Sequence, residues 1–237
     1  MLMLISFASG CTTQGRDYVV ADDYEGFNRA SYEFSDRVDR AVLLPIAKGY
    51  KAITPDIVEQ GVTNFFANIN SLQSSLNGFL QGKPGSGAED LGRFLVNSTL
   101  GIGGLIDIGT RVGLEAQNED LGQTFALWGW EKSRYIYIPL MGPTTWRDFP
   151  GNLLSGYSQR ALLGDSYHWG VSVLGVIDTR ANLIGLTDTR DASALDPYTF
   201  VRDGYVQRRR FLIYDGELPL DDLFDEFDDF EEYDEDP

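Results

Sequence analysis

Apolar side chains recur at helical spacing along most of the chain. Between Glu25 and Val42, the residues Phe27, Phe34 and Val38 share one face of a helix, and polar residues occupy the other faces. Thr54 and Pro55 are typical of a helix N-cap and first turn. The pattern predicts further helices over residues 55–68, 71–80, 88–97, 146–159, 167–186 and 197–210. The fold class is therefore expected to be mainly α, as a single domain.

Three segments depart from the helical pattern. Residues 135–140 combine aromatic and β-branched residues before a proline, which predicts an extended strand. One such strand cannot form a sheet, so we expect little or no sheet. Residues 82–87, with three glycines and a proline, predict a loop. The most apolar candidate for a membrane span, residues 169–186, is interrupted by Asp178 and Arg180, which argues against a conventional transmembrane helix.

Charge is concentrated at the C-terminus. The chain has 36 acidic and 19 basic residues, and 13 of the acids lie in residues 215–237, where there is no Lys or Arg. The rest of the chain is near balance and offers no basic surface for nucleic acid. We expect residues 215–237 to be a disordered acidic tail. Apolar residues at near-helical spacing within it, such as Phe224 and Phe227, leave folding on a partner as the alternative.

The first eleven residues, MLMLISFASGC, resemble the end of a bacterial lipoprotein signal peptide. This predicts a signal peptide over residues 1–10, incomplete because it lacks a basic start, and a lipidated linker over residues 11–21. Cys11 would carry a diacylglycerol and an N-acyl chain. Thr12, in place of Asp, predicts sorting to the outer membrane. The alternative is a free cysteine in an unstructured N-terminus.

Cys11 is the single cysteine of the chain and His168 is the single histidine. An intramolecular disulfide is therefore excluded, and there is no Cys/His cluster for a zinc ion. We expect no metal and no cofactor.

The segments from about Asp22 to Asp215 resemble, in order, those of the MlaA/VacJ family of lipoproteins, which maintain outer-membrane lipid asymmetry. The matching segments are residues 23–29 (DYEGFNR), 64–66 (NFF), 92–104 (GRFLVNSTLGIGG), 119–124 (EDLGQT), 139–143 (PLMGP), 178–181 (DTRA), 196–203 (DPYTFVRD) and 207–208 (QR). The chain is thus identified as similar to this family over residues 22–214, and the two ends fall outside the resemblance.

The resemblance implies a ring-shaped helical domain in the inner leaflet of the outer membrane of a Gram-negative bacterium. It implies an amphipathic channel through the ring, a trimeric outer-membrane porin beside it and a soluble periplasmic carrier. Phospholipid that has strayed into the outer leaflet would pass through the channel to the carrier. No covalent reaction is expected.

One apolar, glycine-rich stretch fits the demands of such a channel. The candidate channel residues are Leu100, Gly101, Ile102, Gly103, Gly104, Leu105, Ile106 and Asp107. Glycine permits close backbone approach, the aliphatic residues suit lipid, and Asp107 is the polar exception. The alternative is that these glycines only allow tight packing or a turn.

Two other groups of residues have open interpretations. The aromatic residues Trp128, Trp130, Tyr135, Tyr137 and Trp146 are typical of either a membrane-interface belt or a core. The basic run at residues 208–210 would meet anionic headgroups or a carrier, or would interact with the helix dipole.

Two different functions compete with transport. A phospholipase would use Ser158 in Gly156-Tyr157-Ser158-Gln159-Arg160 with His168 as base, but Arg160 stands where a nucleophile elbow has its second glycine. His168, beside Trp169, is more typical of a packed or interfacial histidine. A structural tether is the other competitor. A continuous amphipathic cavity would favour transport, and a solid core would favour tethering.

Overall fold

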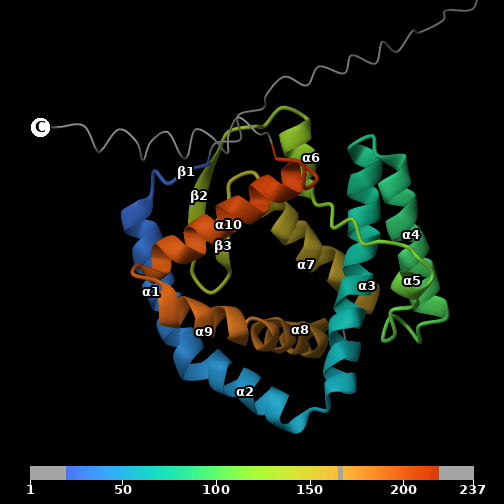
Figure 1. Cartoon of the computed structure of the whole chain (residues 1–237), viewed down its shortest axis with the longest axis horizontal. Coiled ribbons are helices and arrows are strands. Elements are labelled where there is room, and N and C mark those ends of the chain that lie inside the picture. The colour runs from blue at the N-terminus through green and yellow to red at the C-terminus, as the bar shows by residue number, and fades with distance from the viewer. Residues whose placement is uncertain (1–19, 165–167, 219–237) are drawn as a thin grey trace, which may run out of the picture.

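The computed structural model of the chain describes residues 20–164 and 168–218, and within these ranges it is mainly helical, as predicted (Figure 1). The helical elements are α1 (Glu25–Val38), the π-helical turn η1 (Asp39–Leu43), α2 (Leu44–Ile53), α3 (Asp56–Leu80), α4 (Pro84–Thr99), α5 (Ile108–Arg111), α6 (Leu121–Leu127), α7 (Phe149–Leu163), α8 (His168–Asn182), α9 (Ile184–Ser193) and α10 (Pro197–Ile213).

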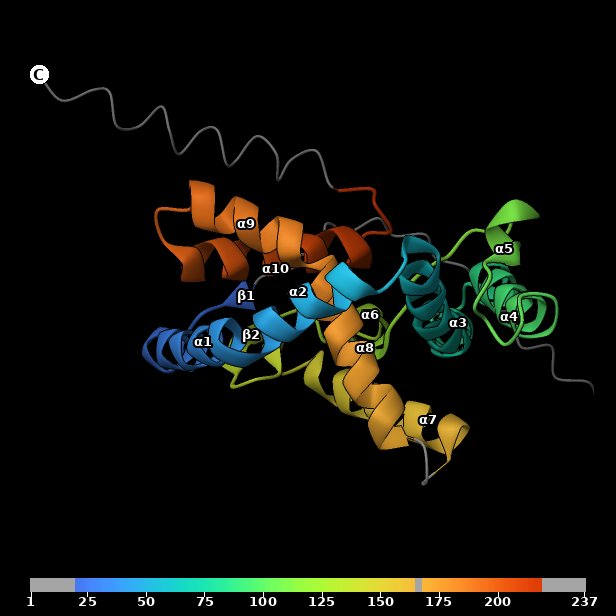
Figure 2. The ribbon, with the colours of Figure 1, turned by 90° about the horizontal axis from the view of Figure 1, so that it is seen from below.

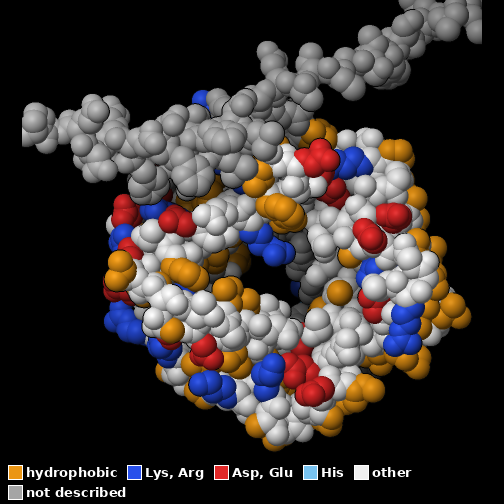
Figure 3. Space-filling view, in the orientation of Figure 1, with side chains coloured by type: hydrophobic (Ala, Val, Ile, Leu, Met, Phe, Trp, Pro, Cys, Tyr) orange, Lys and Arg blue, Asp and Glu red, His pale blue; other side chains and the backbone are white. Residues whose placement is uncertain are grey.

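These helices form a ring. In Figure 1, α1, α2 and α3 follow one another around the left, lower and right sides, and α7 to α10 complete the circuit. The space-filling view in Figure 3 shows an opening at the centre of the ring that side chains do not fill. The helices α4 and α5 lie outside this circuit, on the side of α3 away from the opening (Figure 1). The ring shape expected from the resemblance is thus confirmed.

A small sheet lies beside α1 and α10. It contains β1 (Val20–Ala21), β2 (Ser133–Ile138) and β3 (Gly142–Thr145), in the order β1-β2-β3. β2 is parallel to β1 and antiparallel to β3. The expectation that residues 135–140 have no partner strand was wrong. β3 contains Gly142 and Pro143, which are poor strand formers, and β1 is only two residues long, so neither produces an alternating pattern.

Asn28 ties α1 to the sheet. This side chain is fully buried, and its Nδ2 donates to Oδ1 of Asp22 at 2.7 Å and to the carbonyl of Tyr135 at 3.3 Å. Its Oδ1 accepts from the backbone N–H of Tyr137 at 2.8 Å. The amide thus satisfies the backbone of β2 where no strand is available, which fixes α1 against the sheet.

The core next to the sheet is aromatic. Tyr32, Tyr135, Tyr137 and Tyr198 are buried together, with ring centroids 5.5 Å apart for Tyr32 and Tyr137 and 5.9 Å apart for Tyr32 and Tyr198. Their edge-to-face arrangement is the favoured geometry for neighbouring rings. The two buried members of the predicted aromatic group, Tyr135 and Tyr137, therefore belong to a core, as one of the two interpretations held.

The helix predicted at residues 25–42 continues through a π-helical turn into α2. The turn at Asp39–Leu43 lets the chain change direction, since a π turn disturbs the regular hydrogen-bond ladder (Figure 1). Arg180 of α8 donates from Nε and Nη2 to the two carboxylate oxygens of Asp39, at 2.6 and 2.8 Å. The bend is therefore held to the neighbouring helix α8 by a two-point ion pair.

Helix boundaries differ from the prediction in two places. The segments 55–68 and 71–80 form one continuous helix, α3, in which Asn68 and Ser71, on either side of the expected break, are buried in the helix packing rather than exposed in a turn. The predicted loop at residues 82–87 is mostly helix, since Pro84 begins α4 at a position where proline is favoured.

Candidate functional site

The candidate segment 100–107 forms an irregular turn between α4 and α5. Its apolar side chains point outward: Leu100 is 70% exposed and Ile102 is 66% exposed. Ile102 has φ of 54°, and Gly103 and Gly104 follow with φ of 69° and 94°. A β-branched residue is strained at positive φ, so this turn holds an apolar side chain outward at a conformational cost.

Two of the glycines are required by packing. A Cβ on Gly101 would lie 2.2 Å from the carbonyl oxygen of Ile106, and one on Gly104 would lie 2.7 Å from Nδ2 of Asn68 on α3. Gly103, in contrast, faces open space. The packing role that the sequence left open is therefore present at Gly101 and Gly104.

Asp107 anchors the end of this turn. It caps α5 by accepting from the backbone N–H and the hydroxyl of Thr110, and it pairs with Arg93 of α4 at 3.1 Å. Burial opposes its charge, but the hydrogen bonds from Thr110 and Asn97 and the charge of Arg93 lower the pKa of Asp107 to about 2. The carboxylate is thus ionised and bound at neutral pH.

Behind this turn, the contact between α3 and α4 is polar. Ser74 Oγ donates to Oδ2 of Asp90 at 2.5 Å, and Ser75 Oγ donates to the carbonyl of Gly87 at 2.7 Å. The backbones approach closely, because a Cβ on Gly78 would lie 2.8 Å from the backbone nitrogen of Gly87. Small residues and hydrogen bonds between helices are typical of helix pairs packed in lipid.

The opposite surfaces of α3 and α4 are apolar. Exposed large apolar residues on these two helices are Ile57, Val58, Leu76, Phe79, Leu80, Leu91 and Leu95. In Figure 3, hydrophobic side chains gather along the outer right and lower rim of the ring. Among all described residues, polarity is likewise inverted relative to a water-soluble protein, since the buried residues are mostly polar or charged. The buried hydrophobic residues among them are Tyr32, Ala47, Ile69, Ala126, Tyr135, Tyr137, Ala181 and Tyr198.

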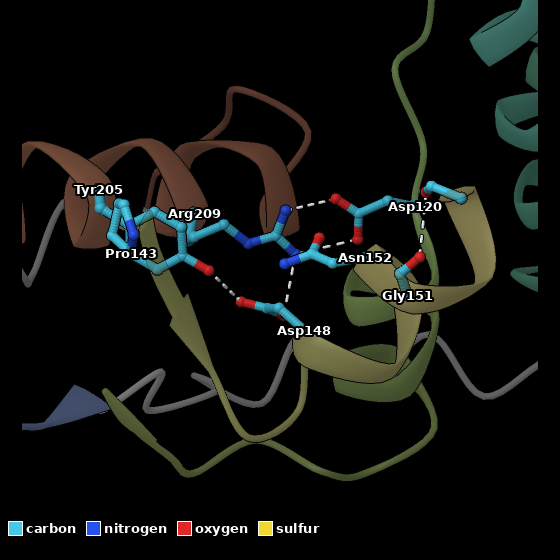
Figure 4. A pocket seen from close by; sticks show the side chains of 8 residues that line it. Asp120, Pro143, Asp148, Gly151, Asn152, Tyr205 and Arg209 are labelled. Carbon is cyan, nitrogen blue, oxygen red and sulfur yellow. Dashed lines mark hydrogen bonds and ion pairs between the residues drawn. The ribbon is translucent and has the colours of Figure 1, made fainter. Parts of the chain in front are cut away.

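A second polar cluster closes the ring where α6, α7 and α10 meet (Figure 4). Arg209 is buried and pairs with Asp120 and Asp148, and Tyr205 donates its hydroxyl to Oδ2 of Asp148 at 2.8 Å. Burial opposes the charges, but their attraction lowers the pKa of Asp120 and raises that of Arg209. A cavity of about 140 Å³ adjoins this cluster.

This cluster shows the role of one residue in the basic run at residues 208–210. Arg209 serves the internal ion pairs, so it is not placed to meet a headgroup, while Arg208 is exposed. The sequence did not indicate Asp120, Asp148 or Tyr205 as partners, because they lie 57 to 89 residues from their contacts.

The other sequence candidates are distributed over the molecule. Trp128, Trp130 and Trp146 are exposed, unlike the buried tyrosines of the same aromatic group. Cys11, the predicted signal peptide and most of the acidic tail lie outside the described residues.

The structure does not support the hydrolase alternative. Residues 156–160 lie within α7 rather than at a strand-to-helix turn, where a nucleophile elbow holds its serine. His168 begins α8 and packs its ring against Trp169, with centroids 5.0 Å apart. Among the described residues, no three His, Cys, Asp or Glu side chains gather as a metal site would require.

Comparison with known proteins gives consistent matches. The model of the MlaA lipoprotein family matches residues 20–212. The chain is 33% identical over 216 residues to the intermembrane phospholipid transport system lipoprotein MlaA of Escherichia coli, covering 89% of this chain and 84% of that protein. It is 34% identical over 193 residues to an uncharacterized protein of Rickettsia bellii, covering 80% and 76% of the two chains.

One solved structure has the same architecture. It is described as the structural basis for maintenance of bacterial outer membrane lipid asymmetry, and it matches with a TM-score of 0.72 at 32% sequence identity. The match covers 81% of this chain and 99% of that chain. The similarity therefore extends over most of this chain and nearly all of the other.

Proposed function

Because this chain belongs to the MlaA lipoprotein family, we propose that it removes mislocalised phospholipid from the outer leaflet of the outer membrane through the opening of its ring and passes it to a soluble periplasmic carrier. As a member of the family, it is an outer-membrane lipoprotein of a Gram-negative bacterium, takes part in intermembrane phospholipid transport that maintains lipid asymmetry, and is not an enzyme. The finer steps, from outer leaflet to carrier, are our proposal.

The observation that carries the proposal is the inverted polarity of the ring. Buried side chains such as Asn77, Asp90 and Arg93 are polar, whereas Leu95 and Ile57 are exposed. A protein in water gains stability by removing apolar surface from solvent, so this distribution is unfavourable in water and favourable when acyl chains surround the rim. This supports a ring that lies within one leaflet.

The opening favours transport over tethering. Figure 3 shows it at the centre of the ring, where a structural tether would be expected to have a solid core. A passage bounded by helices with polar contacts could accept a headgroup without the cost of moving it through hydrocarbon. Lipid would then move by shape and polarity, without a change of covalent bonds.

Residues 100–107 remain our proposed lipid-contacting segment. α3 lies between this turn and the opening, so the turn is on the outer side of the ring (Figure 1). The exposed residues of the turn, Leu100, Ile102 and Leu105, are therefore well placed to meet acyl chains at the rim. That the segment also lines the channel stays a prediction. Acyl chains on Cys11 would hold the protein at the membrane, because none of the described helices is long and apolar enough to cross it. A trimeric porin and the carrier are the proposed partners.

The test is mass spectrometry of lipids that co-purify with the full-length protein, together with a surface assay of outer-leaflet phospholipid on cells lacking and regaining the gene. Ile102→Lys tests the proposed segment. Leu195→Lys is the matched control, because Leu195 is a fully exposed leucine on the connection between α9 and α10.

Intact phospholipid on the wild-type protein, and outer-leaflet phospholipid that rises without the gene and with Ile102→Lys but not with Leu195→Lys, would support the proposal. Lysophospholipid and free fatty acid would indicate hydrolysis instead. No bound lipid and unchanged cells would leave a tether as the better explanation.

A further inference from the structure

Part of the hairpin of α7 and α8 extends beyond the rest of the ring to one side. In the side view of Figure 2, α7 and the adjoining half of α8 project from one side of the ring, and α9 and α10 lie on the other side. The two helices converge at the far end of this projection. Most of the hairpin surface is therefore not covered by other parts of the described chain.

The projecting hairpin is almost free of charge. From His168 to Ile177, α8 has no Asp, Glu, Lys or Arg, α7 has only Arg160, and the sequence between the two helices adds one acid, Asp165. Its exposed residues include Leu153 and Leu154 on α7 and Val173 and Val176 on α8, and Trp169 is 73% exposed. A helix with apolar residues on several faces is stable in a protein core or in a membrane.

Charge returns where the hairpin meets the ring. Asp178 is buried and accepts from Thr63 of α3 at 2.9 Å, and Arg180 is held by Asp39 of η1. These contacts fix the base of α8 in the ring wall. The uncharged part of the helix is thus the part that leaves the ring.

The opposite side of the ring is rich in charge. Among the charged residues of α9 and α10, Asp188, Asp191 and Arg208 are exposed, and Arg202, Asp203 and Arg210 are half-buried. Burying a charge in hydrocarbon is expensive, so the side with α9 and α10 should face water and the hairpin should face the membrane interior.

We propose that the α7–α8 hairpin is a re-entrant element that enters the hydrocarbon more deeply than the ring does and packs against acyl chains of the opposing leaflet. The inference rests on the proposed function and on the inner-leaflet position of the ring that the family resemblance implies. The part of α8 that projects, residues 168–177, rises about 15 Å, as much as the roughly 15 Å of hydrocarbon in one leaflet. Since neither helix can span the membrane alone, the hairpin enters and returns on the same side.

Site-directed spin labelling in liposomes without any other protein tests the depth. Labels are placed in the full-length chain at Val173→Cys on the hairpin, Leu95→Cys on the rim and Asp188→Cys on α9, all exposed positions. Collisions with oxygen, which concentrates in hydrocarbon, are compared with collisions with a water-soluble nickel chelate. The protein without an added cysteine gives the background, since Cys11 is the single natural cysteine. Far-UV circular dichroism confirms that each labelled protein is folded.

The expected order of the oxygen-to-nickel ratio is Val173 above Leu95 above Asp188. A ratio at Val173 equal to that at Leu95 would overturn the inference while leaving the membrane-embedded ring intact. A high nickel accessibility at Val173 with a low one at Leu95 would also overturn it and would indicate a hairpin in water. Nickel accessibility at all three sites would instead contradict the proposed function itself.

Discussion

Nη2 of Arg209 lies 3.1 Å from Oδ1 of Asp148, and this contact joins α10 to the start of α7 inside the ring wall. Asp120 at the start of α6 shares the same guanidinium. One buried cation therefore holds three segments that are far apart in the sequence. Its removal would leave Asp120 without an ion-pair partner and Asp148 with Arg147 as its remaining cation, where the ring closes.

We predict that Arg209→Ala destabilises the fold by about 1–3 kcal/mol, because it leaves Asp120 without an ion-pair partner and removes one of the two arginines that bind buried Asp148. Thermal unfolding in detergent, followed by circular dichroism, measures the loss. Arg208→Ala is the matched control, since Arg208 is exposed on the same helix and its removal should change stability by less than about 0.5 kcal/mol. Equal effects of the two substitutions would contradict the assignment.

The close contact of α3 and α4 predicts a different result for two glycines. Gly78→Ala should destabilise by about 1–3 kcal/mol, because the added Cβ would press on the backbone of Gly87. Gly85→Ala should be neutral or stabilising, since Gly85 is helical and faces open space. The midpoints of chemical or thermal unfolding decide the matter. A stable Gly78→Ala protein would show that the helices can separate without cost.

Asp107 predicts a pH dependence. Its folded pKa of about 2 lies below the ordinary value of 3.8, so its stabilising contribution is present above pH 3.8 and is lost as the pH falls toward 2. The difference in melting temperature between wild type and Asp107→Asn should therefore be constant from neutral pH to about 5 and shrink in more acidic buffer. A difference that stays constant down to pH 2 would count against the bound carboxylate.

The hydrogen bonds of Asn28 predict that the stability of the fold depends on its Nδ2 donor. Asn28→Asp keeps the shape but loses the Nδ2 donor, and it puts a carboxylate near that of Asp22. We expect a loss of about 1–3 kcal/mol, the range for an unsatisfied buried polar group. Asn70→Asp is the control on an exposed amide of α3. If both variants have the melting temperature of the wild type, the hydrogen bonds of Asn28 between α1 and β2 do not contribute to stability.

Local patterns in the sequence predicted most of the helices. Spacing of Phe27, Phe34 and Val38 gave α1, and Pro197 after Asp196 marked the start of α10. These signals are local, because helix caps and apolar stripes depend on neighbours within one or two turns. They did not predict that the apolar stripes would face outward, since periodicity reveals a face but not the medium that covers it.

The rest depends on contacts between distant residues. The partners of β2 could not be predicted, because a two-residue strand and a Gly-Pro strand have no periodicity of their own. The candidate segment 100–107 was found by its composition, yet its position beyond α3 is set by Asn68 and Asn64, which contact it from another helix. Arg209 was noticed only as one of three basic residues.

The π-helical turn at Asp39–Leu43 determines where the chain can gain or lose a residue during evolution. A π turn holds one more residue than the α-helical turn it replaces, so it corresponds to a one-residue insertion absorbed locally. Deleting exposed Ala41 would restore a regular helix and leave Ala47 facing inward, whereas a deletion within α2 would rotate the residues beyond it by about 100°. One-residue insertions and deletions in related sequences should therefore be tolerated at this bend and be selected against in the helices on either side of it.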